Sequence, residues 1–236
     1  MSWYKKFQLS RNPFLKNPKI NADLIVKDIP KLKDLLYYVE SDSIVIVRGE
    51  KNSGKTRFAL EVLNTIKPKQ KNLYIDLKHY NKNVDIEDIL LSVQPMHRRL
   101  LKLYPKNIVL IIDNAFNFNP KFYHRLQYFY DQEYIKSAVI IYKADELVEI
   151  PPSIMSRVGS KYIDLSNMTK DSAIKIVSNR LKGKIFNDEH LDVIYSKSKG
   201  FEDFLSNCEK IAVHYANSRK DFSRKIDIHF IRRMLI

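Results

Sequence analysis

The chain has 236 residues, of which 44% are hydrophobic and 11% aromatic, a composition typical of a globular protein with a substantial core. Its 41 lysines and arginines outnumber its 27 acidic residues and give a net charge of +14, which favours polyanionic partners, nucleic acid above all. A source that uses many lysines would show the same excess without such a partner.

Several cellular settings are disfavoured by the same sequence. The longest apolar run near a strand core, residues 108–112, is far shorter than the roughly 20 residues of a membrane-spanning helix. The first residues lack the apolar stretch of a secretory signal, and the single Cys208 cannot form an intrachain disulfide. We therefore expect a cytoplasmic protein without a membrane partner.

Strands and helices alternate in the first two thirds of the chain. Residues 3–17 mix aromatic and basic side chains and indicate an arm that leads into the domain. Strands are then expected at 43–48, 72–77, 107–113, 137–142 and 161–165, and helices at 29–39, 57–66, 85–103 with a break near Pro95, 123–134 and 153–158. This alternation predicts an α/β fold with a five-stranded parallel sheet flanked by helices.

Beyond residue 165 only helical periodicity is found. We expect helices at 170–181, 188–198, 202–216 and 227–235, with starts marked by Asp171, Asn187 or Asp188, and Asp227, and stops marked by Gly183 and Gly200. The sequence thus predicts three parts: an N-terminal arm over residues 1–20, a base domain over 21–165 and a small helical domain over 166–236.

A phosphate-binding loop lies between the first expected strand and its helix. Residues 49–56 match G-x-x-x-x-G-K-[ST] in full, with a strand before and a helix after. Gly49 and Gly54 leave room for backbone N–H groups, including those of Asn52 and Ser53, to wrap a phosphate at the helix N-terminus. Lys55 would reach the β- and γ-phosphates of ATP, and the hydroxyl of Thr56 would bind Mg²⁺.

A carboxylate for the metal is expected on a neighbouring strand. Residues 109–112 are apolar and end in Asp113, which is therefore the Walker B candidate. The next residue is Asn114, whose amide can hold a water molecule but cannot accept a proton. The factor of about 10² to 10⁴ that a general base contributes to the rate of hydrolysis is therefore in doubt.

Taken together, the phosphate loop, Asp113, the five strands and the helical end resemble the AAA+ superfamily over about residues 10–236. The segment 150–158 is similar to a pattern of clamp loaders and initiators in which the arginine acts across a subunit boundary, which makes Arg157 the arginine-finger candidate. The helical part resembles the AAA+ lid of origin-recognition initiators and transposition regulators. The stretch 11–14 resembles one that packs near adenine in such proteins, although Phe14 could equally anchor a core.

Three positions depart from what the AAA+ resemblance implies. In AAA+ ATPases a Glu is usual at the position where this chain has Asn114. An Arg is frequent in their lid at the position where this chain has Asp203. An Asn, Ser or Thr is usual after the fourth strand, where the polar candidates of this chain are Lys143 and Asp145. These departures predict that the chain binds ATP more securely than it hydrolyses it.

Two functions follow from the resemblance. The first is an ATP-dependent, DNA-associated switch of the replication-initiation, clamp-loading or transposition type, with AAA+ neighbour subunits or other proteins of a DNA-bound assembly as partners. The alternative is a degenerate AAA+ subunit that serves as a protein-interaction module with a structural nucleotide. An aromatic and basic helix near residues 123–130 could stack on nucleic acid, but core packing of one face is the preferred interpretation.

Overall fold

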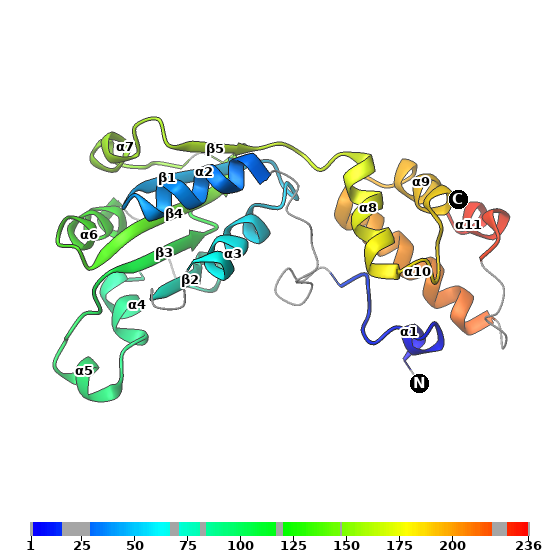
Figure 1. Cartoon of the computed structure of the whole chain (residues 1–236), viewed down its shortest axis with the longest axis horizontal. Coiled ribbons are helices and arrows are strands. Elements are labelled where there is room, and N and C mark those ends of the chain that lie inside the picture. Colours follow the sequence, from blue (N-terminus) through cyan, green and yellow to red (C-terminus); the bar gives the residue numbers. More distant parts are fainter. Residues whose placement is uncertain are drawn as a thin grey trace. The chain divides into compact units, whose positions relative to one another are not determined.

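The structure, a computed structural model, describes residues 2–15, 29–66, 71–80, 84–116, 120–146, 148–218 and 226–235. These residues fall into two compact units, which Figure 1 shows with their elements labelled. An α/β unit extends from residue 29 to Asn167, and a helical unit combines residues 2–15 with the chain from Met168 onward. Each unit has its own hydrophobic core.

The sheet of the α/β unit has five parallel strands, as the sequence predicted. They are β1 (Ile44–Gly49), β2 (Asn72–Asp76), β3 (Ile108–Asp113), β4 (Ile135–Lys143) and β5 (Tyr162–Leu165), in the spatial order β2-β3-β4-β1-β5. Every residue of β3 is buried, and so are the residues of β1 from Ile44 to Val47. The carboxyl ends of β1 and β3 therefore lie at one edge of the sheet, on either side of β4.

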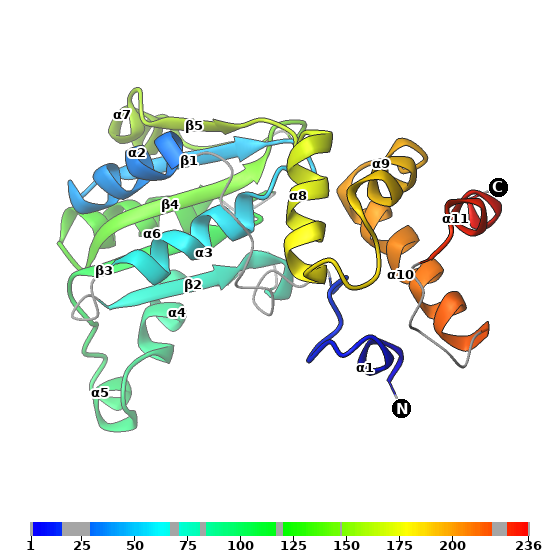
Figure 2. The ribbon, with the colours of Figure 1, turned by 45° about the vertical axis from the view of Figure 1, so that its right-hand side comes forward.

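Helices cover both faces of this sheet. The elements are α2 (Ile29–Glu40), α3 (Lys55–Thr65), the short 3₁₀ helix η1 (Leu77–His79), α4 (Ile86–Ser92), α5 (Met96–Leu100), α6 (Pro120–Asp131) and α7 (Pro152–Val158). Helices α2 and α3 pack on each other and on β1 and β4, and they lie in front of the strands in Figure 2. Helices α4, α6 and α7 belong to a core that includes Ile46, Leu110 and Ile140. The helix expected at 85–103 is split, because Pro95 ends one segment and precedes α5.

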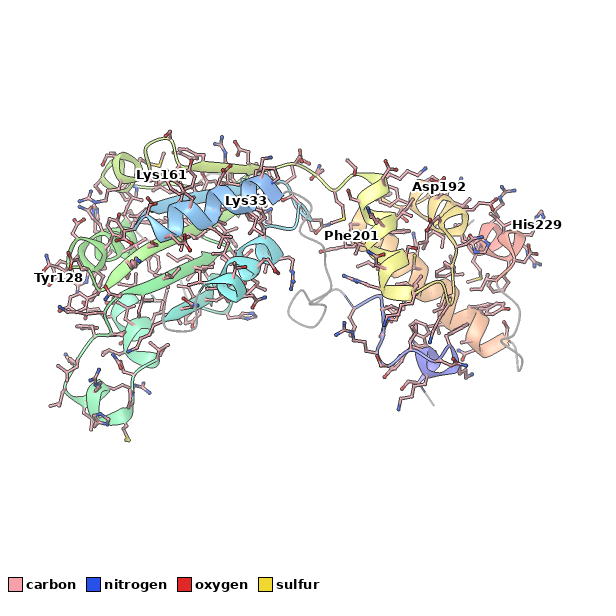
Figure 3. The ribbon with its side chains drawn as sticks, viewed as in Figure 1. Lys33, Tyr128, Lys161, Asp192, Phe201 and His229 are labelled. Atoms are coloured by element: carbon pink, nitrogen blue, oxygen red, sulfur yellow. The ribbon has the colours of Figure 1, made fainter. Side chains whose placement is uncertain are left out.

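Helix α6 confirms the preference for core packing over an open aromatic face. Tyr123 and Phe129 are each 1% exposed, and both belong to the main core. Tyr128 is 49% exposed at the surface of the unit (Figure 3), with the guanidinium of Arg125 over its ring at 5.3 Å from the centroid.

The helical unit contains α1 (Trp3–Lys6), α8 (Lys170–Leu181), α9 (Asp188–Ser196), α10 (Phe201–Ser218) and α11 (Ile228–Met234). Asn187 and Asp227 cap α9 and α11 as expected, whereas the cap of α8 is Thr169, whose hydroxyl accepts from the backbone N–H of Ser172. Gly200 adopts a φ of 108°, which explains a glycine between α9 and α10. No helix within the described ranges is long and apolar enough to cross a membrane.

Aromatic side chains join the N-terminal residues to this unit. Phe14 is 1% exposed, stacks on Trp3 with a centroid distance of 5.8 Å and lies 6.2 Å from the ring of Phe186. The backbone carbonyl of Pro13 accepts from Arg180 at 2.9 Å, which fixes the chain just before the ring. Residues 2–15 are therefore part of the helical unit, and Phe14 is a core anchor.

We predict that Phe14→Ala destabilises the helical unit by about 3–5 kcal/mol, because removal of a buried ring leaves a cavity against Trp3 and Phe186. Urea unfolding followed by the fluorescence of Trp3, the single tryptophan of the chain, would measure the change. The control is Tyr37→Ala, which removes a side chain that is 66% exposed on α2. Equal free energies of unfolding for the two variants would contradict the prediction.

Candidate nucleotide-binding site

The loop between β1 and α3 has the backbone of a phosphate-binding loop. A Cβ atom on Gly49 would lie 2.5 Å from the carbonyl oxygen of Leu165 and 2.7 Å from Ser53 Oγ, so this position requires glycine. Asn52 and Gly54 adopt left-handed conformations with φ of 67° and 88°. These angles turn the loop back onto the first turn of α3, where backbone N–H groups and the helix dipole favour an anion.

Lys55 is held at the centre of this loop. Its ammonium group donates to the carbonyl oxygens of Gly49 at 2.8 Å and Glu50 at 2.6 Å, and to Ser53 Oγ at 3.3 Å. The residue is only 9% exposed, and burial lowers the pKa of Lys55 while the charge of Asp113 opposes that shift. The loop thus surrounds one positive charge with oxygens, and the negative charge of Asp113 at the end of β3 acts on it.

Asp113 joins the phosphate loop to β3. Its Oδ2 atom accepts hydrogen bonds from Thr56 Oγ1 at 2.6 Å and from the hydroxyl of Tyr74 at 2.8 Å, and its Oδ1 atom accepts from the backbone N–H of Asn114 at 2.8 Å. The residue is 3% exposed, so these donors satisfy a buried carboxylate. From the sequence we expected Thr56 and Asp113 to bind the same metal ion, and the structure places their side chains in contact.

Tyr74 is a member of the site that sequence reasoning missed. It lies in β2, opposite Ile111 of β3, and no motif marks it. Burial and the charge of Asp113 raise the pKa of Tyr74, so its hydroxyl stays protonated and remains a donor. Its signal in the sequence is weak, because only the register between β2 and β3 brings it to Asp113.

The oxygen atoms at this site are of the kind that Mg²⁺ prefers. Thr56 contributes a hydroxyl and Asp113 a carboxylate, and Mg²⁺ is commonly held by one or two carboxylates together with water and substrate phosphates. In the part of the chain that the structure describes, no group of three or more His, Cys, Asp and Glu side chains could form an all-protein metal cage. The Thr56 hydroxyl and the Asp113 carboxylate are therefore the oxygens that could hold a magnesium ion at this site.

Asn114 sits directly after Asp113 in a left-handed conformation with φ of 57°. Its side-chain amide donates to Asp76 Oδ1 at 2.8 Å, so an acid from β2 lies against the position where the AAA+ resemblance implies a glutamate. Asp76 is the second residue of the site that the sequence analysis did not single out.

The end of β4 also reaches the phosphate loop. Lys143 pairs with Gly49 in the register of β4 and β1, and the backbone N–H of Ala144 donates to the Gly49 carbonyl at 3.1 Å. The Lys143 ammonium group is bound to Glu146, which raises the pKa of Lys143, and it lies 5.6 Å from the centre of the Phe116 ring. Of the two polar candidates that the sequence suggested, Lys143 is thus the last residue of β4 and is paired with β1 at the loop.

Arg157 and Asp203 have other partners in the structure. The guanidinium of Arg157 in α7 forms a two-point ion pair with Asp131 of α6, with nitrogen–oxygen distances of 3.0 and 2.7 Å, and donates to the Ser153 carbonyl. Asp203 lies in the first turn of α10 and accepts from the backbone N–H of Lys199 at 2.8 Å. The roles considered for these two residues stay predictions.

A family model described as an AAA domain matches residues 41–148, which include the phosphate loop, Asp113 and Asn114. Over these residues the sequence is similar to an AAA domain. Its five-stranded parallel sheet and flanking helices agree with this assignment, and they confirm the AAA+ resemblance on which the sequence analysis depended.

Solved structures extend the likeness beyond the AAA domain. Cdc6p from Pyrobaculum aerophilum matches with a TM-score of 0.65 and 17% identity over 92% of this chain and 67% of that one. The ORC1 protein of Aeropyrum pernix, solved in complex with DNA, matches with a TM-score of 0.68 and 15% identity over 94% of this chain and 67% of that one. A RuvB variant of Thermotoga maritima matches with a TM-score of 0.58 and 15% identity over 87% of this chain and 67% of that one. At these identities the likeness shows an AAA+ fold, over about two thirds of each longer chain.

A comparison of the sequence with curated proteins gave no significant match. The similarity to an AAA domain therefore rests on the family model and on the fold together.

We predict that Tyr74→Phe weakens Mg²⁺-dependent binding of ATP by roughly 3- to 10-fold, because Asp113 loses one of its donors, worth about 0.5–1.5 kcal/mol. Titration of a fluorescent ATP analogue with and without Mg²⁺ would measure this. Tyr80→Phe, which alters a tyrosine that is 43% exposed, serves as the control and should bind as the unmodified protein does. Unchanged affinity in the Tyr74 variant would show that the hydroxyl does not position Asp113.

Proposed function

We propose that this chain binds ATP with Mg²⁺ and acts as an ATP-dependent switch in a DNA-bound assembly of the replication-initiation, clamp-loading or transposition type. The observation that carries the proposal is the contact of Thr56 with Asp113 beside the Lys55 ammonium group. In this arrangement a cation for phosphate and two oxygen donors for a metal lie at the same edge of the sheet.

In the proposed complex each part of the site contacts a different part of the nucleotide. Backbone N–H groups of residues 49–54 would surround the β-phosphate, and Lys55 would exchange its contacts with Gly49 and Glu50 for phosphate oxygens. Thr56 and Asp113 would hold Mg²⁺, which neutralises phosphate charge when bound. The α/β unit then serves as the base and the helical unit as the lid of an AAA+ protein.

Hydrolysis by the isolated protein is expected to be slow. Asn114 replaces the usual glutamate, Asp203 stands where a positively charged lid residue is frequent, and Arg157 is engaged by Asp131 within its own chain. The same observations support the alternative, in which a degenerate AAA+ subunit keeps nucleotide for structure and acts as a protein-interaction module.

DNA is the proposed polyanionic partner. The net charge of +14 supplies long-range attraction, and among the structural relatives the Aeropyrum pernix ORC1 and the Drosophila ORC were solved with DNA. AAA+ neighbour subunits are the second class of partner. Arg157, on the surface of the α/β unit, is the residue proposed to act on the nucleotide of such a neighbour.

We predict that Lys55→Ala abolishes detectable ATP binding, because the buried ammonium group at the centre of the loop supplies the charge for the phosphates. Calorimetric titration with ATP and Mg²⁺ would show the loss. The matched control is Lys33→Ala, which removes the same charge from an exposed position on α2 (Figure 3) and should bind normally. Unchanged affinity in the Lys55 variant would overturn the nucleotide site.

A further prediction concerns Arg157. Arg157→Ala should leave ATP binding by the monomer nearly intact, yet remove ATP-driven self-association and any tightening of DNA binding by ATP, because both need the guanidinium at a neighbour's γ-phosphate. Sedimentation and DNA titration with and without ATP would test it. In the titrations we expect the affinity for DNA to fall by about 0.9 log unit per phosphate contact for each log unit of salt concentration.

The matched control for Arg157 is Arg48→Ala. Arg48 also forms a two-point pair with an aspartate, Asp164, on the surface of the same unit, so its loss removes an equivalent charge and ion pair. Equal ATP-driven assembly by the Arg157 variant and the unmodified protein would exclude the finger role and favour the interaction module.

A further inference from the structure

A second carboxylate lies one strand away from Asp113. Asp76 is the last residue of β2 and pairs with Asp113 in the register of β2 and β3, so both acids lie at the carboxyl edge of the sheet. Its Oδ1 atom accepts from Asn114 Nδ2 at 2.8 Å, and its side chain is 26% exposed. Unlike Asp113, Asp76 therefore combines contact with the Asn114 side chain and access to water.

Asn114 and Asp76 have complementary chemistry. An amide can orient water through its oxygen but cannot take a proton, whereas a carboxylate can take one. Because the Asn114 nitrogen donates to Asp76, the amide oxygen remains as an acceptor for a water hydrogen bond. The pair thus divides between two strands the two roles that a single glutamate after Asp113 combines, and it can support slow hydrolysis without that glutamate.

We propose that Asp76 is the general base for ATP hydrolysis in this chain and that Asn114 orients the attacking water. The inference rests on the proposed binding of ATP at the phosphate loop. In the step, the water oxygen forms a bond to the γ-phosphorus and one water proton moves to the Asp76 carboxylate. The bond from the γ-phosphorus to the bridging oxygen breaks, and its electron pair stays on ADP. The proton then leaves Asp76 for solvent.

Asp76 also has a local structural role that any test must separate from catalysis. Its Oδ1 atom accepts from the backbone N–H of Lys78 at 3.1 Å and caps η1, and Oδ2 lies 3.6 Å from His79 Nε2. Asp85 has the same capping geometry at the start of α4, where its Oδ1 accepts from the N–H of Glu87 at 3.1 Å. Asp85 thus provides a control that shares the cap and stands on a different element from the phosphate site.

The decisive variant is Asp76→Asn, which keeps the size of the side chain and an oxygen for the cap. Single-turnover hydrolysis should fall about 100-fold or more, the contribution typical of a general base. Affinity for ATP should stay within about twofold, because a general base acts in the transition state and adds little to binding of the substrate. Nucleotide recovered from the complex should be ATP instead of ADP. Asp85→Asn should hydrolyse at the unmodified rate, and Asp76→Glu should retain more activity than Asp76→Asn.

Several outcomes would overturn the inference. Hydrolysis by Asp76→Asn at the unmodified rate would do so. An equal loss of hydrolysis in Asp76→Asn and Asp85→Asn would also do so, as would a fall in the unfolding temperature of Asp76→Asn that accounts for its lost activity. If the unmodified protein binds ATP but shows no hydrolysis, the role of Asp76 fails while nucleotide binding stands. If the unmodified protein binds no ATP, the proposed function itself fails.

Discussion

The hydrogen bond between Thr56 and Asp113 is the constraint on which the site depends. It joins the first turn of α3 to the end of β3, two segments 57 residues apart in the chain. In this sheet β4 lies between β1 and β3 and all three strands are parallel, so their carboxyl ends meet at one edge. The order of the strands, and the helices that allow parallel connections, therefore determine the chemistry at this edge.

Burial of two opposite charges at this edge requires dense hydrogen bonding. Asp113 and Lys55 are 3% and 9% exposed, and an unpaired charge at that depth would be strongly destabilising. Thr56, Tyr74 and the N–H of Asn114 satisfy the carboxylate, while oxygens of the loop satisfy the ammonium group. The site is thus preorganised, because rigid elements already hold the donors and acceptors that phosphate and metal would use.

Much of this arrangement follows from local sequence patterns. The strands and the phosphate loop could be predicted because a buried β-branched run and a glycine-rich turn are recognisable over a few residues. Tyr74 and Asp76 could not, because their importance arises from the register of β2 against β3, which no short motif encodes. The same holds for the pair of Arg157 with Asp131, since it joins separate elements. The sequence pointed to Asp171 for the start of α8, whereas its cap is Thr169. Threonine and aspartate both favour a helix start, so the sequence alone does not decide between them.

The division of roles between Asn114 and Asp76 bears on how such a switch would be timed. The contacts of Lys55 lie within the loop between β1 and α3, whereas Asp76 lies on β2, the strand at the other side of the sheet. Strand β2 pairs only with β3 in this sheet, so its position depends on one set of strand hydrogen bonds. On the proposed mechanism a displacement of β2 would separate the base from the attacking water. It would also withdraw the Tyr74 hydroxyl from Asp113, whereas the contacts of Lys55 within the loop would stay in place. On that mechanism the position of β2 would affect the lifetime of the ATP state.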